Sequence, residues 1–500
     1  MKFIVKYQVE LIISFILIAS YFVLRLPNLT LQPIFADEAI YIRWAQVMKA
    51  EPTLRFLPLS DGKTPLYMWL LMPMFKVFTD PLFAGRLLSV ISGFFTLMGV
   101  FFLSKKVFNL KVALWASLLY IITPYVVFFD RMALVDSMLS AFTIWSLYFA
   151  LWLMESQRLD IAMILGYLLG GAILTKTPAT TSILILPVSL LALGKKNSQK
   201  YPYLTALLLL GVSIMIALIM YNLLRLGPNF HLLSSRNSDY IFSPLELKDR
   251  PLDPFIPHFH DISDWFPKLF SWPILILGLI GVAKLFWVKD RRGWVILFWA
   301  LIPLLLEMTF LRTFTARYLL TFAPAFLIFA SFGLTQILSK FKSKNILKIF
   351  IALIIILPLA LKFDFQLIKN PPPLNLPKEE RRGYFEEWTA GYGLKDIANY
   401  LIAQKKNGSV VVGTAGFFGT LPDGLQIYMD KSDIAIVGSS ATISAQIRTS
   451  AKDHLIYFVG NKNDLEGKIK DVKLILEYPK AKPQDNTKQD STALYQVLAN

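Results

Sequence analysis

The chain has 500 residues, of which 55% are hydrophobic and only 17% charged, with a formal net charge of +17 and no cysteine. Soluble domains average about 25% charged residues, so the composition excludes a mainly soluble protein, and the lack of cysteine excludes disulfides, thiolate metal sites and cysteine nucleophiles. The positive charge does not indicate nucleic-acid binding, because the lysines and arginines lie in short segments between apolar runs without a nucleic-acid reader motif.

Apolar runs that approach the length needed to cross a bilayer, about 20 residues, recur along the first 362 residues. Lys2 and Lys6 precede the first run, which we interpret as a retained helix and not as a cleaved signal peptide, because many runs follow and no small-residue cleavage site is clear. About eleven spans are predicted, near residues 9–26, 86–104, 111–129, 134–154, 160–175, 179–194, 202–224, 271–288, 294–311, 317–338 and 346–362. The apolar segment Pro65–Thr79 is short, which favours a juxtamembrane or re-entrant helix.

The charges between the spans predict the orientation. If the N-terminus is cytoplasmic, every predicted inner loop is basic, as the positive-inside rule requires. The cations of these loops are Lys105, Lys106, Lys111, Arg158, Lys195, Lys196, Lys200, Lys284, Lys289, Arg291, Arg292, Lys340, Lys342, Lys344 and Lys348. We therefore expect a multi-pass protein of the cell (plasma) membrane whose odd number of spans places the C-terminal region outside.

The composition changes after residue 362. Residues 363–380 form a proline-rich linker, and residues 381–500 alternate short helix and strand patterns, which predicts a small extracytoplasmic α/β domain. The expected helices are Leu394–Lys405 and Ile443–Ser450, and the expected strands are Ser409–Val412, Ile434–Val437, Leu455–Val459 and Val472–Tyr478. We interpret Gly413, Gly416 and Gly419 as turn glycines and not as a nucleotide-binding loop. Anchoring at the membrane interface is favoured over stacking on sugar rings as the role of Tyr384, Trp388 and Tyr392.

Ionisable residues that the inner loops do not explain all fall at one predicted face of the membrane. They come from the segments FADEAIY (35–41) and KTPLY (63–67) of the outer loop 27–85, and from GRLLS (85–89), DRMALVD (130–136), LTK (174–176) and RY (317–318). Each residue alone could belong to a solvated surface, to an ion pair between helices or to a side chain that snorkels to the lipid headgroups. Their convergence favours a site at the lipid–water boundary, because ionisable groups near hydrocarbon tend to pair or to function.

Transfer of a sugar from a polyprenyl-phosphate carrier requires this combination of side chains. The lipid stays in the bilayer, and cleavage of the sugar–phosphate bond leaves a phosphate monoester with a charge of roughly −1.5 to −2 at neutral pH. Lysine and arginine stabilise that charge, and a carboxylate on the other side of the sugar can accept the proton of an acceptor hydroxyl. Attack opposite the leaving group would invert the anomeric centre.

At these segments the sequence resembles the GT-C glycosyltransferases, and specifically the branch of the protein O-mannosyltransferases and aminoarabinose transferases, over about residues 1–340. The resemblance implies a GT-C-like fold, Asp37 as the catalytic carboxylate and Asp136 as a second essential acid. It also implies contacts to the donor phosphate from Lys63, Arg86, Arg131 and Lys176. We further expect Glu38 among the catalytic residues, Arg317 among the phosphate ligands, and Tyr67 and Tyr318 among the substrate-binding residues.

One position departs from the family pattern, because Thr64 stands where the branch has a proline after its lysine or histidine. The branch generally needs no metal, and the adjacent Asp37 and Glu38 lack the Asp-x-Asp spacing of metal-dependent oligosaccharyltransferases. We therefore expect no cofactor, with a divalent ion at Glu38 and a histidine as the alternative. The expected partners are the polyprenyl-phosphate sugar, which is dolichyl- or undecaprenyl-linked, a protein, lipid or glycan acceptor that presents a hydroxyl or phosphate, and membrane lipids.

Two other functions remain open at this point. A transporter or flippase of lipid-linked glycans would also bind a polyprenyl phosphate, but transporters usually carry broken helices and polar groups near the midplane. An O-antigen polymerase or ligase would act on similar lipids, but would be expected to lack the Asp37–Glu38 placement directly after the first span.

Overall fold

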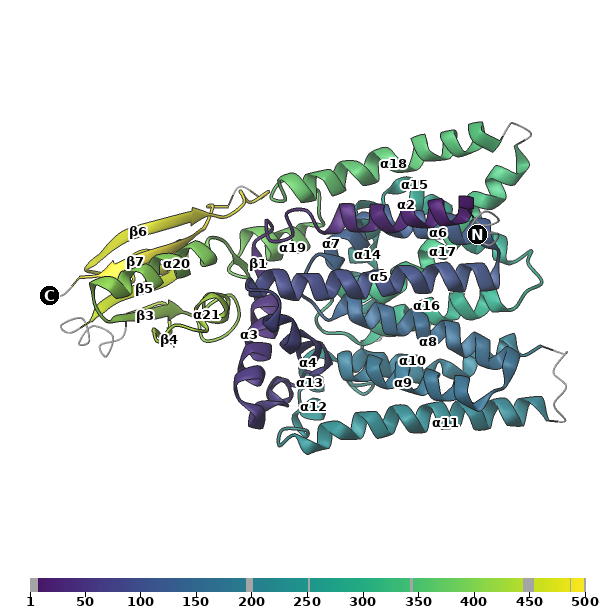
Figure 1. The fold of residues 1–500 in the computed structure, drawn as a ribbon, viewed down its shortest axis with the longest axis horizontal. Coiled ribbons are helices and arrows are strands. Elements are labelled where there is room, and N and C mark those ends of the chain that lie inside the picture. The colour runs from purple at the N-terminus through teal and green to yellow at the C-terminus, as the bar shows by residue number, and fades with distance from the viewer. Residues whose placement is uncertain are drawn as a thin grey trace.

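A computed structural model describes residues 8–194, 201–250, 252–341, 345–443, 454–485 and 487–498. A bundle of long helices forms one part of the molecule, and a sheet domain built by the C-terminal residues lies at one end of it (Figure 1). The described start of the first helix lies at the opposite end of the bundle (Figure 1).

Among the described residues, the bundle has six helices that are long and apolar enough to cross a membrane, and up to eight such spans if each of two bent helix pairs counts as one. Three shorter apolar helical segments accompany them. The elements of the bundle are α2 (Gln8–Arg25), α5 (Pro81–Val107), α6 (Leu110–Ile122), α7 (Pro124–Asp130), α8 (Asp136–Ser156), α9 (Leu159–Thr175), η4 (Thr177–Ala179), α10 (Thr180–Leu184), η5 (Leu186–Ala192), α11 (Pro202–Asn222), η6 (Leu223–Leu226), α14 (Phe255–Phe270), α15 (Trp272–Leu285), α16 (Arg292–Phe310), η7 (Ala316–Thr321), α17 (Phe322–Lys340) and α18 (Asn345–Lys369).

Every predicted span coincides with one of these helical segments, but the number of true spans stays a prediction. The two bent pairs are α6 with α7, at 60°, and α14 with α15, at 111°. Each bend has a proline at its start, Pro124 or Pro273, which cannot donate the backbone hydrogen bond that would continue the preceding helix. The sequence pattern identified the apolar run in each case and missed the break.

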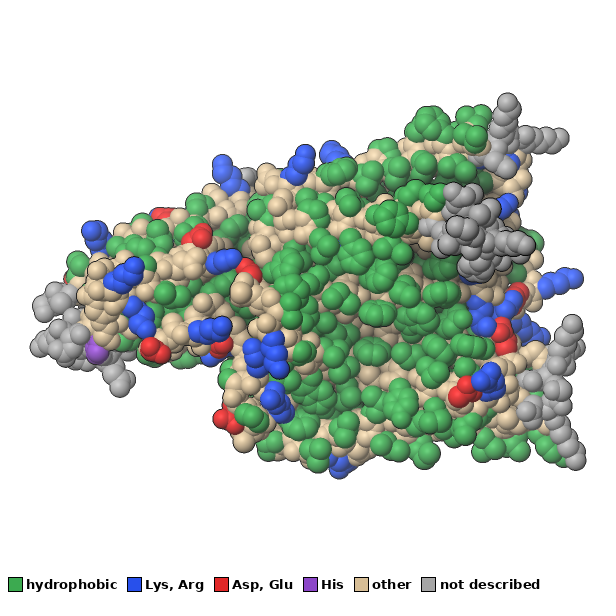
Figure 2. Space-filling model, in the orientation of Figure 1, with side chains coloured by type: hydrophobic (Ala, Val, Ile, Leu, Met, Phe, Trp, Pro, Cys, Tyr) green, Lys and Arg blue, Asp and Glu red, His purple; other side chains and the backbone are tan. Residues whose placement is uncertain are grey.

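The surface of the bundle is suited to a bilayer. Figure 2 shows a wide hydrophobic surface over the helices, with charged side chains gathered at its two ends. In α11 and α18 only 22% of the apolar window is buried, whereas 83% is buried in the segment that contains η7 and α17. Helix α17 is therefore a central helix, and α11 and α18 present hydrocarbon-compatible surface at the periphery.

Short elements cover the end of the bundle that faces the sheet domain. They are β1 (Ile34–Phe35), α3 (Ala36–Ala50), η1 (Pro52–Leu54), η2 (Leu57–Asp61), α4 (Leu66–Leu71), η3 (Met72–Lys76), α12 (Leu232–Ser235) and α13 (Asn237–Tyr240). The short helix predicted for Pro65–Thr79 is found as α4 and η3. Strand β1 pairs antiparallel with β2 (Ala390–Gly391), so the start of α3 is joined to the C-terminal domain.

The C-terminal domain contains a five-stranded sheet in the order β4-β3-β5-β7-β6. Strand β3 is parallel to β4 and β5, whereas β7 is antiparallel to β5 and β6. The elements are α19 (Lys378–Arg381), η8 (Arg382–Glu386), α20 (Leu394–Gln404), η9 (Lys405–Asn407), β3 (Val410–Ala415), α21 (Asp423–Met429), β4 (Ala435–Ser439), β5 (Leu455–Asn461), α23 (Lys462–Leu465), β6 (Val472–Pro479) and β7 (Ser491–Val497).

Three details differ from the sequence-based expectations for this region. Helix α18 continues to Lys369, so the extended linker is shorter than 363–380. Gly413 lies within strand β3, whereas Gly416 and Gly419 have φ of 125° and 100° and lie in the turn that follows. Strand β7 was not predicted, and the helix expected at Ile443–Ser450 falls almost entirely outside the described residues.

Candidate active site

The first turn of α3 directs two adjacent acids in different directions. Glu38 is fully buried and accepts hydrogen bonds from the backbone N–H of Phe35 at 2.9 Å and of Ala133 at 2.6 Å. Neighbouring residues on an α-helix are about 100° apart around its axis. Asp37 therefore faces away from this buried contact, and its side chain remains 18% exposed.

Arg86 completes the buried site of Glu38. Its Nε and Nη2 donate to the two carboxylate oxygens at 2.8 Å, and both side chains are fully buried. The remaining donors of Arg86 reach the carbonyl oxygens of Leu29, Gln32 and Pro33. These internal partners join the outer loop to α5 and do not favour a catalytic role for Glu38 or a phosphate contact for Arg86, so both roles stay predictions.

Arg131 and Tyr67 have internal partners as well. Arg131 donates to the carbonyl oxygens of Arg25 at 2.6 Å and of Pro27 and Asn28 at 3.0 Å, which satisfies carbonyls that the end of α2 leaves unpaired. Tyr67 is fully buried, and its hydroxyl donates to the carbonyl of Gly85 at 2.8 Å. This burial does not favour a contact of Arg131 with phosphate or of Tyr67 with substrate, and both contacts stay predictions.

Five other predicted residues surround the accessible carboxylate of Asp37 or lie beside it. Arg317 Nη1 lies 2.6 Å from Asp37 Oδ2, and Lys63 Nζ lies 3.9 Å from Asp37 Oδ1. Lys176 Nζ lies 2.6 Å from Asp136 Oδ1 and 3.9 Å from the ring centroid of Tyr318. Because Tyr318 directly follows Arg317, the two ion-paired groups are adjacent. The structure thus brings together Asp37, Lys63, Asp136, Lys176, Arg317 and Tyr318, which we call the charged cluster.

Two further residues extend the charged cluster. Lys63 Nζ also lies 3.2 Å from Asp61 Oδ2, and Arg236 Nη1 lies 2.7 Å from Asp61 Oδ1. Asp61 was overlooked although it stands two residues before Lys63 in the same loop. Arg236 gives no sequence signal, because only the folded chain brings the segment after α12 to that loop.

The cations of the charged cluster keep Asp37 ionised. Burial raises the pKa of Asp37, but the positive charges of Arg317 and Lys63 outweigh burial and lower the pKa to about 2. Burial lowers the pKa of Lys63, but its neighbours Tyr41, Asp37 and Asp61 outweigh burial and leave that pKa raised. At neutral pH the arrangement is a carboxylate between two full positive charges.

Aromatic side chains border the cluster on the side of the C-terminal domain. Lys63 Nζ lies 5.4 Å from the ring centroid of Tyr41 and 5.6 Å from that of Trp44, whose ring lies 5.9 Å from Phe418. Tyr384 is buried and packs against Phe35, whereas Trp388 is 54% exposed. Interface anchoring by Tyr384 does not fit its burial, and for Trp388 and Tyr392 it stays a prediction.

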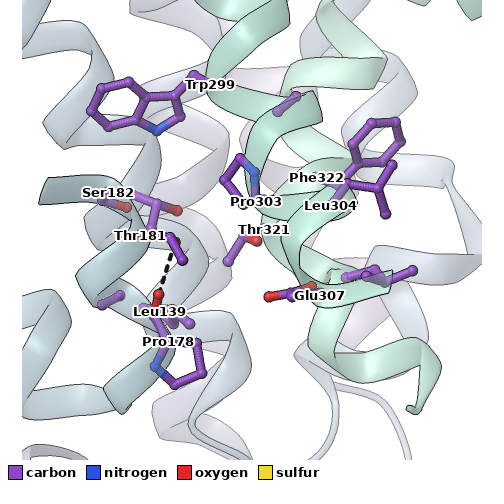
Figure 3. Close-up of a pocket in the computed structure, with 14 residues that line it drawn as sticks. Leu139, Pro178, Thr181, Ser182, Trp299, Pro303, Leu304, Glu307, Thr321 and Phe322 are labelled. Carbon is purple, nitrogen blue, oxygen red and sulfur yellow. Dashed lines mark hydrogen bonds between the residues drawn. The ribbon is translucent and has the colours of Figure 1, made fainter. Parts of the chain in front are cut away.

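A narrow cavity, with about 470 Å³ of empty space when its part open to solvent is included, lies beside the Lys176–Asp136 pair. Its walls come from α8, α16, η7 and the start of α17, and the segment of η4 and α10 (Figure 3). Glu307, on α16, is the one ionisable side chain among the lining residues, and the sequence analysis did not select it.

Among the residues that the structure describes, no three histidine, aspartate or glutamate side chains gather as a metal site would require. The alternative of a divalent ion held by Glu38 and a histidine does not fit, because Arg86 and two backbone N–H groups already bind that carboxylate.

Comparisons with known proteins agree with this architecture. Residues 62–221 match the family model of the dolichyl-phosphate-mannose-protein mannosyltransferases. The fold is similar to that of ArnT from Cupriavidus metallidurans, in the apo state (TM-score 0.58, 15% identity) and bound to undecaprenyl phosphate (TM-score 0.61, 14% identity), with 99% of both chains covered in each case. It is also similar to the oligosaccharyltransferase AglB from Archaeoglobus fulgidus in complex with an inhibitory peptide and a dolichol-phosphate (TM-score 0.55, 12% identity), over 92% of this chain and 70% of that chain.

A search of curated proteins gives no significant match. The family model and the solved structures together confirm the resemblance to GT-C glycosyltransferases of the ArnT and protein mannosyltransferase type.

Proposed function

We propose that the protein is an inverting glycosyltransferase that moves a monosaccharide from a polyprenyl-phosphate donor to a hydroxyl or phosphate acceptor at the outer membrane face. The observation that carries the proposal is the position of Asp37 between Arg317 and Lys63, with the Lys176–Asp136 pair beside them. The fold comparison supports the donor class, because ArnT is known with undecaprenyl phosphate and AglB with a dolichol-phosphate.

The cations of the charged cluster supply the phosphate site. Lys63, Lys176 and Arg317 are partly exposed, at 25%, 19% and 13% of their side chains, so each can exchange a carboxylate partner for a phosphate oxygen. Arginine can bind phosphate with two parallel hydrogen bonds. As the sugar–phosphate bond breaks, the electron pair of that bond passes to the phosphate oxygen, and these cations stabilise the charge that develops there. In this proposal the side chains supply the positive charge that a metal ion would otherwise provide.

Asp37 accepts the proton of the acceptor. A carboxylate held by two cations is a weak base, as its pKa of about 2 indicates. A donor phosphate would draw hydrogen bonds of Arg317 and Lys63 away from Asp37, and the basicity of Asp37 would then rise. The acceptor oxygen attacks the anomeric carbon opposite the phosphate, so the product is inverted. Asp136 is a positioning residue in this scheme, because its contact at 2.6 Å holds Lys176 beside Tyr318.

Location and topology belong to the same proposal. A cell (plasma) membrane protein with a cytoplasmic N-terminus would place the charged cluster and the C-terminal domain on the outer side. The basic loops predicted for the inner side and the opposite placement of α2's start and the sheet domain support this arrangement (Figure 1).

The proposal is tested by incubating the purified protein with undecaprenyl phosphate carrying single sugars and with a peptide, a lipid or a glycan that offers an acceptor hydroxyl or phosphate. The panel comprises mannose, glucose, galactose, glucosamine and 4-amino-4-deoxyarabinose, and release of undecaprenyl phosphate is scored by mass spectrometry. We expect release from at least one donor, and none from Asp37→Asn. Asp160→Asn is the matched control, because Asp160 pairs with Arg158 at an exposed position. Binding of every donor without any release would contradict an enzyme and favour a transporter.

A further inference from the structure

The cavity beside the charged cluster begins where the donor phosphate is proposed to bind. Leu139 lies on α8 about one turn after Asp136, and Pro178 stands two residues after Lys176. Leu319 follows Tyr318 directly. A group joined to a phosphate held by Lys176 therefore has this cavity next to it.

Glu307 gives the cavity a chemical preference. Figure 3 shows its carboxylate directed across the cavity toward the side of Leu139 and Pro178, with no hydrogen bond drawn to it. Within the described part of the chain, no side chain or backbone group forms a hydrogen bond or ion pair with this carboxylate, although Lys176 and Asp136 act on it electrostatically. The group is thus available to a ligand.

The rest of the lining is mainly apolar with a few polar groups, a combination that suits a sugar ring with apolar faces and hydroxyl edges. Thr143, Thr181, Ser182 and Thr321 contribute hydroxyl groups, and Trp299 contributes an aromatic ring (Figure 3). The hydroxyl of Thr181 donates to the carbonyl of Pro178 at 2.8 Å, which leaves its oxygen free to accept. A polyprenyl chain in the cavity would leave the carboxyl group of Glu307 without a hydrogen-bond partner, which is costly for a buried polar group. A sugar would instead supply hydrogen-bond donors.

We propose that Glu307 is a specificity-determining residue that accepts a hydrogen bond from a hydroxyl or ammonium group on the ring of the donor sugar. The inference rests on the proposed function and deepens it, because it assigns the cavity to the sugar and not to the lipid chain. Glu307 does not take part in the chemistry itself.

The test compares the sugar-bearing donor with the bare lipid. For the panel donor that the wild-type protein turns over, dissociation constants of that donor and of undecaprenyl phosphate are measured in nanodiscs for the wild type, Glu307→Gln and Glu307→Leu. Glu307→Leu removes the hydrogen-bond acceptor and should weaken donor binding about tenfold, while binding of undecaprenyl phosphate stays unchanged. A glucosamine or aminoarabinose donor would indicate an ammonium partner, and a neutral hexose a hydroxyl partner.

Thr309→Val is the matched control, because the Thr309 hydroxyl donates to the carbonyl of Leu305 on the same helix outside the cavity. Thermal unfolding of each variant shows whether the fold is retained, and Glu307→Gln keeps the size of the side chain. Equal donor affinity in the wild type and Glu307→Leu would overturn the inference alone, because glutamine keeps an acceptor oxygen and leucine has none. Tighter binding of both lipids by Glu307→Leu would overturn the inference and indicate that the lipid chain occupies the cavity. A lack of turnover with every donor would overturn both the inference and the proposed function.

Discussion

Arg317 and Asp37 are joined by an ion pair of 2.6 Å, although Arg317 begins the last central helical segment of the bundle and Asp37 lies in the first outer loop. Lys63 lies on the other oxygen of the same carboxylate at 3.9 Å. The same two cations are the groups that we propose for the donor phosphate. Binding of the donor phosphate is therefore coupled, in our account, to a rise in the basicity of Asp37.

This coupling predicts a difference between two pH profiles. The acid limb of kcat/KM reports the free enzyme, in which Arg317 and Lys63 hold the pKa of Asp37 at about 2. The acid limb of kcat reports the donor complex, in which the phosphate shares these cations and the pKa of Asp37 is higher. Activity needs the ionised carboxylate in both cases, so the acid limb of kcat should lie at higher pH. Coincident limbs in steady-state assays would contradict the coupling.

The phosphate ligands predict a second result. Lys63→Met and Arg317→Lys should each weaken binding of undecaprenyl phosphate by roughly tenfold to a hundredfold, because each removes charge-assisted hydrogen bonds to the phosphate. Isothermal titration with undecaprenyl phosphate in detergent measures the effect. Lys395→Met, which removes an exposed partner of Asp80, serves as the control. Unchanged affinity in both variants would place the phosphate elsewhere.

The buried pair of Glu38 and Arg86 predicts a change of stability instead of affinity. Arg86→Met leaves the carboxylate of Glu38 buried without its cation, and loss of one partner of such a pair costs about 3–5 kcal/mol. We expect a clear drop in the thermal unfolding temperature, with a smaller drop for the double variant Glu38→Gln, Arg86→Met. A folded Arg86→Met protein of wild-type stability that fails only to bind undecaprenyl phosphate would restore Arg86 as a phosphate ligand.

The sequence predicted the bundle well because apolar runs of membrane length carry a strong signal. It also identified most of the charged cluster, because each residue stands at an end of an apolar run where a charge is unexpected. It could not separate Asp37 from Glu38 or Arg317 from Arg86. Whether such a charge is accessible depends on the partners that the folded chain brings to it, such as the backbone carbonyls around Arg86.

Residues whose role depends only on packing gave no comparable signal. Glu307 lies in an apolar helix, and only the arrangement of α16 against α8 and the η4–α10 segment shows that it faces a cavity. Arg236 lies in a polar segment, where an arginine is common and gives no sign of a function. Its contact with Asp61 depends on the tertiary structure. The bend between α6 and α7 was not predicted for a similar reason, because the apolar run continues through it.

The central claim, that Asp37 is the base of a lipid-phosphate sugar transferase, is tested most directly by separating chemistry from binding. The measurement is the release of undecaprenyl phosphate from the preferred sugar donor, with an acceptor present, by the wild-type protein and by Asp37→Asn, alongside the affinity of each protein for that donor. Our account predicts that release is lost in Asp37→Asn while the donor still binds, because Arg317, Lys63 and Lys176 remain in place. Release at the wild-type rate by Asp37→Asn would contradict it.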